Sequence, residues 1–135
     1  MQGIKEFISA NDAFARHVGI ELLEVDAGRA KAKLDVAAEH KNGLGIVHGA
    51  AIFALADLAF AAASNSHGTA AVAVNANVNF MRATHEGVLF AEATETSRNH
   101  KLATYDVAVT NGEGELVAGF TGMVYRKKDS IPVAG

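Results

Sequence analysis

The sequence predicts an α+β fold in which a curved antiparallel sheet of five to six strands wraps around one long central helix. Three observations support this prediction. One long run of residues is almost entirely apolar, about six shorter runs have the composition of strands, and strands do not alternate with helices as they do around a parallel sheet. With 135 residues and 50% hydrophobic content, the chain is long enough for a real core, and we expect residues 1–135 to form a single domain.

The first predicted element is a short helix from about Asn11 to His17. Asn11 or Ser9 can cap its start, and Gly19 can end it. The preceding residues, MQGIKEFISA, have neither the basic region nor the long apolar run of a signal peptide.

A hairpin is predicted next, from two strand-like segments over residues 20–28 and 29–37 that meet at turn residues. In the second segment, the small and apolar residues alternate with charged ones. The apolar set is Ala30, Ala32, Leu34 and Val36. This period of two is typical of a half-buried strand.

The central helix is predicted over residues 49–66, where nearly every side chain is apolar. Eight of the fourteen residues from Ala50 to Ala63 are alanine, the best helix former. A helix that is apolar on all sides must be enclosed by other structure. The glycines before it, at 43, 45 and 49, miss the spacing of a dinucleotide-binding G-x-G-x-x-G by one residue, so a nucleotide fold is rejected.

Four more strands complete the inventory, separated by turn residues. They are predicted over residues 71–82, 88–98, 101–110 and 115–126. In the first of them, the alternate residues from Val72 to Phe80 are apolar, and we expect this face to belong to the core. Residues 127–135 are expected to be disordered. A sheet of this kind around one helix is the hot-dog fold.

Composition excludes several classes of function. There are no cysteines, which excludes disulfides and thiolate metal sites and suggests a reducing, cytoplasmic compartment. The net charge of −3 gives no global attraction to nucleic acid. Because Asp57 interrupts the longest apolar run, no stretch reaches the roughly 18 residues of a membrane span. The histidines show no paired metal-binding spacing, so no metal is expected.

Asp57 is the only charged residue of the predicted helix. A buried, unpaired carboxylate costs several kcal/mol, so we expect this side chain to be paired, protonated or functional. A salt bridge with Arg82 or Lys101 and a catalytic role are both compatible with the sequence.

Gly49 stands at the start of the same helix, where free backbone N–H groups carry the positive end of the helix dipole. Such a terminus can stabilise a carbonyl oxygen as it becomes negative, although glycines at helix starts are more often plain caps. Asp57 lies eight residues further on, which is about 12 Å along a helix. One helix can hardly place both groups on one substrate, so we hypothesise a homodimer with two shared sites.

These residues also carry a family resemblance. The run NGLGIVHGA at 42–50, IFALAD at 52–57, SNSHG at 64–68 and FARHVGIELLEV at 14–25 resemble the hot-dog thioesterases of the phenylacetate-degradation (PaaI) type. The resemblance covers nearly the whole chain. It implies hydrolysis of acyl-coenzyme A (CoA) thioesters, without a cofactor, in a cleft between subunits of a homotetramer built from two dimers.

The resemblance also implies roles for individual residues. Asp57 matches the catalytic acid, acting as general base or as nucleophile, and Gly49 matches the residue whose N–H polarises the thioester carbonyl. Asn42 matches a polar residue near the attacking water, and His48 a histidine that orients the turn or the carbonyl. Alone, these two would be a turn former and a capping histidine. Ala50 departs from the HGG common in the family, which bears on substrate fit.

Substrate contacts follow from the same implication. Phe53 and Phe60 are candidates for an aryl-acetyl or other aromatic acyl group, although such residues are more often core. The turn holding Arg98, Asn99 and Lys101 is the best cluster for the CoA phosphates, unless it is an ordinary charged hairpin. Arg82 and residues 126–128 rank lower, and the asparagines at 75, 77 and 79 line a subunit interface, the pantetheine tunnel or solvent. A non-catalytic acyl-CoA or small-acid binding module of the same fold is the alternative.

Overall fold

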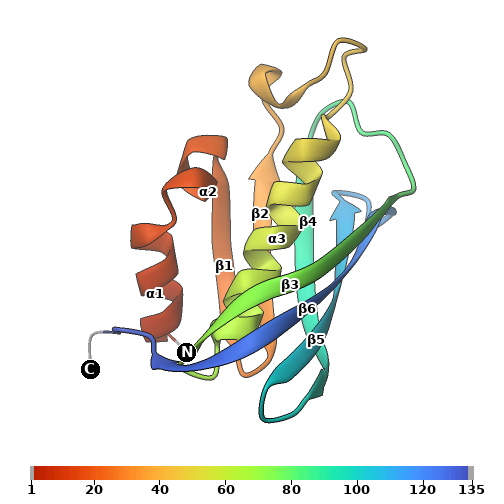
Figure 1. Ribbon diagram of the computed structural model, residues 1–135. Coiled ribbons are helices and arrows are strands. Elements are labelled where there is room, and N and C mark those ends of the chain that lie inside the picture. Colours follow the sequence, from red (N-terminus) through yellow and green to blue (C-terminus); the bar gives the residue numbers. More distant parts are fainter. Residues whose placement is uncertain (1, 134–135) are drawn as a thin grey trace.

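The computed structural model describes residues 2–133. Its elements, in chain order, are α1 (Gln2–Asn11), α2 (Ala13–Val18), β1 (Ile20–Asp26), β2 (Arg29–Asp35), the 3₁₀ turn η1 (Ala38–His40), α3 (Gly49–Asn65), β3 (Thr69–Phe80), β4 (Val88–Arg98), β5 (Leu102–Asn111) and β6 (Leu116–Ser130). Helix α3 lies inside the curve of the sheet, and α1 and α2 lie beside β1 (Figure 1). None of the helices described is long and apolar enough to cross a membrane.

The six strands form one antiparallel sheet in the order β1-β2-β4-β5-β6-β3. Strands β1 and β3 are therefore its two edges. The predicted hairpin and the predicted strands are present, and the α+β hot-dog architecture is confirmed. Strand β3 pairs with β6 from Thr69, opposite Ser130, to Phe80, opposite Ala118.

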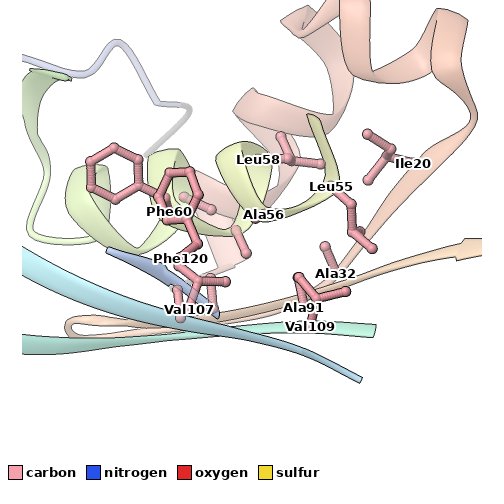
Figure 2. Packing of buried hydrophobic residues seen from close by; sticks show 14 of the residues in the cluster. Ile20, Ala32, Leu55, Ala56, Leu58, Phe60, Ala91, Val107, Val109 and Phe120 are labelled. Atoms are coloured by element: carbon pink, nitrogen blue, oxygen red, sulfur yellow. The ribbon is translucent and has the colours of Figure 1, made fainter. Parts of the chain in front are cut away.

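The core lies between α3 and the concave face of the sheet. Leu55, Ala56 and Ala59 of the helix are completely buried, as are Ala32 and Ala91 on the strands beneath them (Figure 2). Small side chains on both surfaces let the helix and the sheet approach closely. The alternation predicted for β2 is confirmed, because Ala30, Ala32 and Leu34 all point into this core.

The N-terminal region differs from the prediction. Helix α1 was not predicted, although Ile4, Phe7 and Ile8 in QGIKEFISAN have the i, i+3, i+4 spacing of an amphipathic helix. Ile4 is buried and Ile8 packs against the core, so tertiary contacts stabilise this helix. The cap of α2 is Asp12, whose side chain accepts a hydrogen bond from Ala15 N (3.0 Å), in place of Asn11 or Ser9. The stop at Gly19 is confirmed by its left-handed φ of 93°.

Strand β3 contradicts most of the expected core face, although Val78 does pack against the core. Val72, Val74 and Phe80 are 49–56% exposed, and the asparagines on the opposite face are exposed as well. The reason is topological: β3 is an edge strand, and nothing in residues 2–133 covers its outer edge. Alternation within a strand identifies two faces, but it does not say whether either one is covered.

The C-terminal segment is more ordered than expected. Strand β6 continues to Ser130, so residues 127–130 belong to the sheet instead of a disordered tail. Residues 134–135, which that expectation included, lie outside the described residues.

The core leaves no room for a side chain at Gly122 of β6. A Cβ atom there would lie 2.6–2.9 Å from the ring of Phe60, which is itself 1% exposed and packed against Tyr105 and Phe120. Because the ring cannot retreat, Gly122→Ala is expected to lower the free energy of unfolding by about 1–3 kcal/mol. Urea denaturation measures this. Gly119→Ala in the same strand meets no atom within 4 Å and is the control, and an equal loss in both variants would contradict the packing argument.

Candidate active site

The loop before α3 is held in a fixed shape by its own polar groups. Asn42 Oδ1 accepts hydrogen bonds from Leu44 N (2.9 Å) and Ile46 N (3.4 Å), which confirms Asn42 as a turn former. His48 N donates to His40 O (2.7 Å), and Val47 N donates to the carbonyl of a second loop at residue 84 (2.8 Å). These bonds fix where the helix begins.

At the start of α3, one backbone N–H has no hydrogen-bond acceptor within residues 2–133. His48 is the N-cap, and its Nδ1 accepts a hydrogen bond from Ala50 N (2.9 Å). The His48 carbonyl accepts from Ala51 N (3.0 Å) and Ile52 N (3.3 Å). Among the described residues, Gly49 N–H has no acceptor, so the first turn presents a single free N–H at the positive end of the helix dipole.

Phe80 forms one wall beside this donor. A Cβ at Gly49 would meet Phe80 Cζ at 3.1 Å, so the ring lies directly against the glycine. Phe80 is 53% exposed and stands at the end of β3. Sequence reasoning assigned it to the core, and its pairing with the helix start becomes visible only in three dimensions.

Asp57 lies on the outer stripe of α3, which we define as Ala50, Ala54, Asp57 and Ala61. In the single chain this residue is largely open to solvent and its carboxyl is only partly buried, which corrects the expectation of full burial. It makes no salt bridge within residues 2–133, and Arg82 pairs with Glu115 instead (3.3 Å). The structural ion pair considered for Asp57 is therefore wrong.

The surroundings of Asp57 favour its neutral form. Partial burial among apolar neighbours raises the pKa of this carboxyl above its usual value, and the negative charge of Asp12 adds to the effect. Asp12 reaches this region because it caps α2, which packs against α3. An acid with a raised pKa and no cation beside it suits proton transfer.

Gly49 and Asp57 do not meet within one chain. Helix α3 is continuous from Gly49 to Asn65, so the two residues are separated by about 12 Å along its axis. A single chain therefore cannot bring the Gly49 N–H and the Asp57 carboxyl to the same point.

The two phenylalanines of α3 are placed in the core. Phe60 is 1% exposed and contacts Tyr105 and Phe120, with ring centroids 5.8 and 5.4 Å away. Figure 2 shows Phe60 beside Phe120. Phe53 is partly buried and packs edge-on to Phe120 at 5.3 Å. The expectation that Phe60 contacts substrate is corrected, because a ring enclosed in this way cannot reach a bound ligand, and Phe53 serves the same aromatic cluster.

In the predicted phosphate-binding turn, Asn99 shapes the backbone and Arg98 forms an ion pair. Asn99 Oδ1 accepts from Lys101 N (3.0 Å) and Leu102 N (2.9 Å), so Asn99 shapes the turn. Arg98 is held by Glu95 (3.4 Å). Burial would raise the pKa of that glutamate, but hydrogen bonds from His67 and Tyr105 and the nearby charges lower it, so Glu95 stays an anion beside Arg98.

Lys101 contributes to a pocket of about 300 Å³, here called the basic pocket. Its lining residues are Thr69, His100, Lys101, Tyr125, Arg126, Lys127 and Lys128. The strand pairing of β3 with β6 assembles it, since Ala71 lies opposite Arg126. Of the three turn residues predicted for phosphate binding, the structure therefore places only Lys101 in a concave basic site, together with lysines that were ranked lower.

A helix N-terminus with one free N–H, a carboxyl with a raised pKa and a pocket of cations are the parts needed to hydrolyse an activated, anionic acyl compound. The thioesterase superfamily matches residues 44–118 of the chain. The acyl-coenzyme A thioesterase PaaI of Escherichia coli is 38% identical over 86% of this chain and 84% of its own length. A relative from Archaeoglobus fulgidus is 40% identical over 98% of this chain and 86% of its own length.

Comparison with solved structures gives the same result as comparison of sequences. The structure of the E. coli PaaI protein superposes with a TM-score of 0.92, at 35% identity, covering 96% of this chain and 94% of that one. A mutant form of the phenylacetic acid degradation protein PaaI from Thermus thermophilus gives 0.81, at 38% identity, with 84% and 98% covered.

The protein is thus a thioester hydrolase of the hot-dog fold. It belongs to the thioesterase superfamily and, within it, to the PaaI-type acyl-CoA thioesterases.

Proposed function

We propose that the protein hydrolyses an aryl-acetyl or related aromatic acyl-CoA, and that each active site combines Gly49 of one chain with Asp57 of a second copy. The observation that carries this proposal is the single free N–H at the start of α3, with an unpaired acid on the same helix that cannot reach it. The names of the relatives from E. coli and T. thermophilus, which refer to phenylacetic acid degradation, support the aromatic acyl group.

The proposed reaction uses these two groups in turn. Gly49 N–H donates a hydrogen bond to the thioester carbonyl oxygen, which becomes negative as water attacks the carbonyl carbon. The carboxylate of Asp57 takes the proton from that water. When the tetrahedral intermediate collapses, the C–S bond breaks and the departing sulfur receives the proton that Asp57 took from the water, which yields the free acid and coenzyme A. Attack by Asp57 itself, with a mixed anhydride hydrolysed afterwards, uses the same positions.

Two further residues have supporting roles in this proposal. His48 caps the helix and pairs with the neighbouring Ala50 N–H, so that Gly49 N–H is the one donor of the first turn left for a ligand. Asn42 uses its side-chain oxygen in the turn, which leaves the amide Nδ2 as the group that faces the attacking water.

The edge strand β3 supports pairing with a second copy. It is twelve residues long, contains no charged residue and exposes Val72 and Val74 on one face. A long uncharged edge strand with open backbone groups favours addition of another strand. Antiparallel pairing of β3 with β3 of a second copy about a two-fold axis satisfies both edges at once.

Such pairing brings the separated parts together. Within a chain, Gly49 lies at the Phe80 end of β3, and Asn65 at the end of α3 hydrogen-bonds to Ala71 N (2.9 Å) near the other end. A two-fold axis sets the Phe80 end of one strand against the Thr69 end of the other. The Gly49 terminus of one chain then approaches the partner's α3 and the partner's basic pocket, which binds the CoA phosphates. The tetramer that the resemblance implies stays a prediction.

A thiol-release assay tests this function. The protein is incubated with phenylacetyl-CoA and other acyl-CoAs, and free CoA is measured with a thiol reagent. Turnover with phenylacetyl-CoA among the preferred substrates is expected. Binding of acyl-CoA without thiol release would instead support the alternative of a non-catalytic binding module, and a preference for non-aromatic acyl groups would contradict the aryl-acetyl assignment.

The charge of Asp12 gives a test of the general base. Activity requires ionised Asp57, and because its pKa is raised, activity is expected to fall as pH decreases through that raised value. Asp12→Asn keeps a good helix cap but removes the neighbouring negative charge, which lowers the pKa of Asp57. The acidic limb of kcat/KM against pH is therefore expected to move to lower pH.

The matched control is Asp35→Asn, which removes an exposed carboxylate at the end of β2. It should leave the acidic limb in place. An acidic limb that stays unmoved in Asp12→Asn would contradict the coupling between the two acids.

A further inference from the structure

Asn65, the last residue of α3, occupies part of the open edge of β3. Its Oδ1 accepts a hydrogen bond from Ala71 N (2.9 Å). Its Nδ2 donates to Ala71 O (3.4 Å) and to Ala61 O (2.8 Å), the latter within the helix. The side-chain amide therefore bonds to both backbone groups of Ala71, as a neighbouring strand would.

These two backbone groups of Ala71 belong to the outer edge of the sheet. Ala71 lies opposite Arg126 of β6, and Arg126 N donates to Lys101 O on the side of β5. Because the N–H and C=O of one strand residue point to the same side, Arg126 turns both groups away from β3. Ala71 therefore directs its own groups away from β6, and Asn65 removes them from any pairing with a second copy.

An irregularity next to this cap shortens the usable edge further. The register of β3 against β6 shifts just after Ala73, so that Val74 is an extra residue, as in a β-bulge. A bulge bends an edge strand and interrupts regular pairing. The cap and the bulge together leave residues 75–80 as the regular open edge. Two antiparallel copies of this segment pair about its midpoint, which places the two-fold axis at Asn77 or Val78.

The proposed catalytic groups lead independently to the same axis. For each Gly49 to meet the Asp57 of a second copy, the axis must pass α3 midway between these residues, four of the sixteen residue steps along the helix. The start and the end of α3 lie beside Phe80 and Ala71 of β3. A quarter of the nine steps between those two is about two residues, counted from the Phe80 end. The axis therefore falls near Val78.

We propose that Asn65 is a positioning residue, which sets the register of the β3 pair by withholding Ala71 from it. This inference rests on the proposed function. Moving the axis by one residue slides the two strands past each other by two residues, about 6.6 Å at roughly 3.3 Å per residue. A general base acts within about 3 Å of the water it deprotonates. A shift of one residue therefore separates Gly49 from the acid that serves it.

Disulfide cross-linking reads this register directly. The chain contains no cysteine, so a single introduced cysteine can only link to its counterpart in another copy. Asn75, Asn77 and Asn79 are exposed and alternate along β3, which makes them matched positions. Under mild oxidation, Asn77→Cys is expected to form linked dimers readily. Asn75→Cys is expected to form few, because its two copies are at least about 13 Å apart along the strands.

Asn65→Ala frees the backbone groups of Ala71 and is expected to move the axis toward Asn75. Cross-linking should then increase for Asn75→Cys and decrease for Asn77→Cys. In the chain without introduced cysteines, Asn65→Ala is expected to lower kcat for thiol release at least about tenfold, because the catalytic groups are displaced from one another. Thermal melting checks that each variant is folded.

Ser66→Ala is the matched control. Its hydroxyl also stabilises the end of α3, since it donates to Ala63 O (2.7 Å) and accepts from Gly28 N (2.8 Å), away from β3. This variant should lose stability but keep the cross-linking pattern of the unaltered chain.

The outcomes separate the register from the pairing. An unchanged pattern in folded Asn65→Ala would overturn the positioning role while β3 pairing stands. Cross-linking that is fastest at Asn75 in chains that keep Asn65 would overturn it as well, so the proposal is tested even if Asn65→Ala does not fold. Failure to cross-link at all three positions would overturn the pairing of β3 and the shared site of the proposed function.

Discussion

Replacing Asp57 with Asn is expected to lower kcat by at least about a hundredfold, the effect of removing a positioned general base. Asn has nearly the same shape but cannot accept a proton from water. Steady-state thiol release from a preferred acyl-CoA measures the loss. The same exchange at Asp106, an exposed acid on β5, is the control and should change kcat little. Near-normal turnover in folded Asp57→Asn would remove this residue from the mechanism.

The same variant, Asp57→Asn, is expected to lose activity but to gain stability. The pKa of Asp57 is raised in the folded chain, so the ionised form is disfavoured there relative to the unfolded chain. The contribution of Asp57 to stability is therefore full below the unfolded pKa and is lost as pH rises through the folded value. Asp57→Asn is expected to melt at a higher temperature than wild type at neutral pH, and this gain should shrink in acid. A catalytic loss together with a stability gain distinguishes a functional acid from a structural one.

Gly49→Pro is the second large effect, because it deletes the free N–H at a helix position whose backbone accommodates proline. Gly49 is the first residue of α3, the position where proline is best tolerated, and His48 has the extended conformation (φ −63°, ψ 139°) that a following proline requires. Removing one such donor is expected to reduce kcat by about 10²–10³. Gly49→Ala adds a Cβ against Phe80 but keeps the N–H, so it separates crowding from loss of the donor. Equal losses in both variants would assign the effect to crowding.

Mixing the two inactive variants tests whether the site is shared. When Asp57→Asn and Gly49→Pro chains are unfolded and refolded together, half of the pairs are mixed. Each mixed pair has one site with an intact Gly49 from one chain and an intact Asp57 from the other. Activity is expected to recover to about a quarter of wild type. A mixture no more active than its components would show that both groups act within one chain.

The sequence predicted the central helix well, because its signal is local. A run of alanine and leucine favours a helix whatever surrounds it, and α3 ends at Asn65, within one residue of the prediction. The hairpin of β1 and β2 was equally readable from the alternation that ends in Leu34 and from the turn at Gly28.

Properties that depend on contacts between residues far apart in the chain could not be predicted from the sequence. The exposure of β3 follows from its place at the sheet edge, and the burial of Phe60 follows from Tyr105 and Phe120 on other strands. Asp12 was missed because a helix cap gives no signal of a nearby acid 45 residues later in the chain. For Lys127 and Lys128, the charge was recognised, but only the pairing of β6 with β3 brings them to Thr69.

Because of strand β3, the rate of synthesis is also expected to affect how much of the protein aggregates. A chain that has not formed the proposed β3 pairing displays twelve uncharged residues with an open row of amide and carbonyl groups. Other nascent chains offer the same open row, and extended segments of this kind seed insoluble aggregates as readily as they form correct pairs. Slow expression at low temperature is therefore expected to favour recovery of active enzyme. Replacing one central residue of β3 with lysine is expected to increase solubility and to reduce activity.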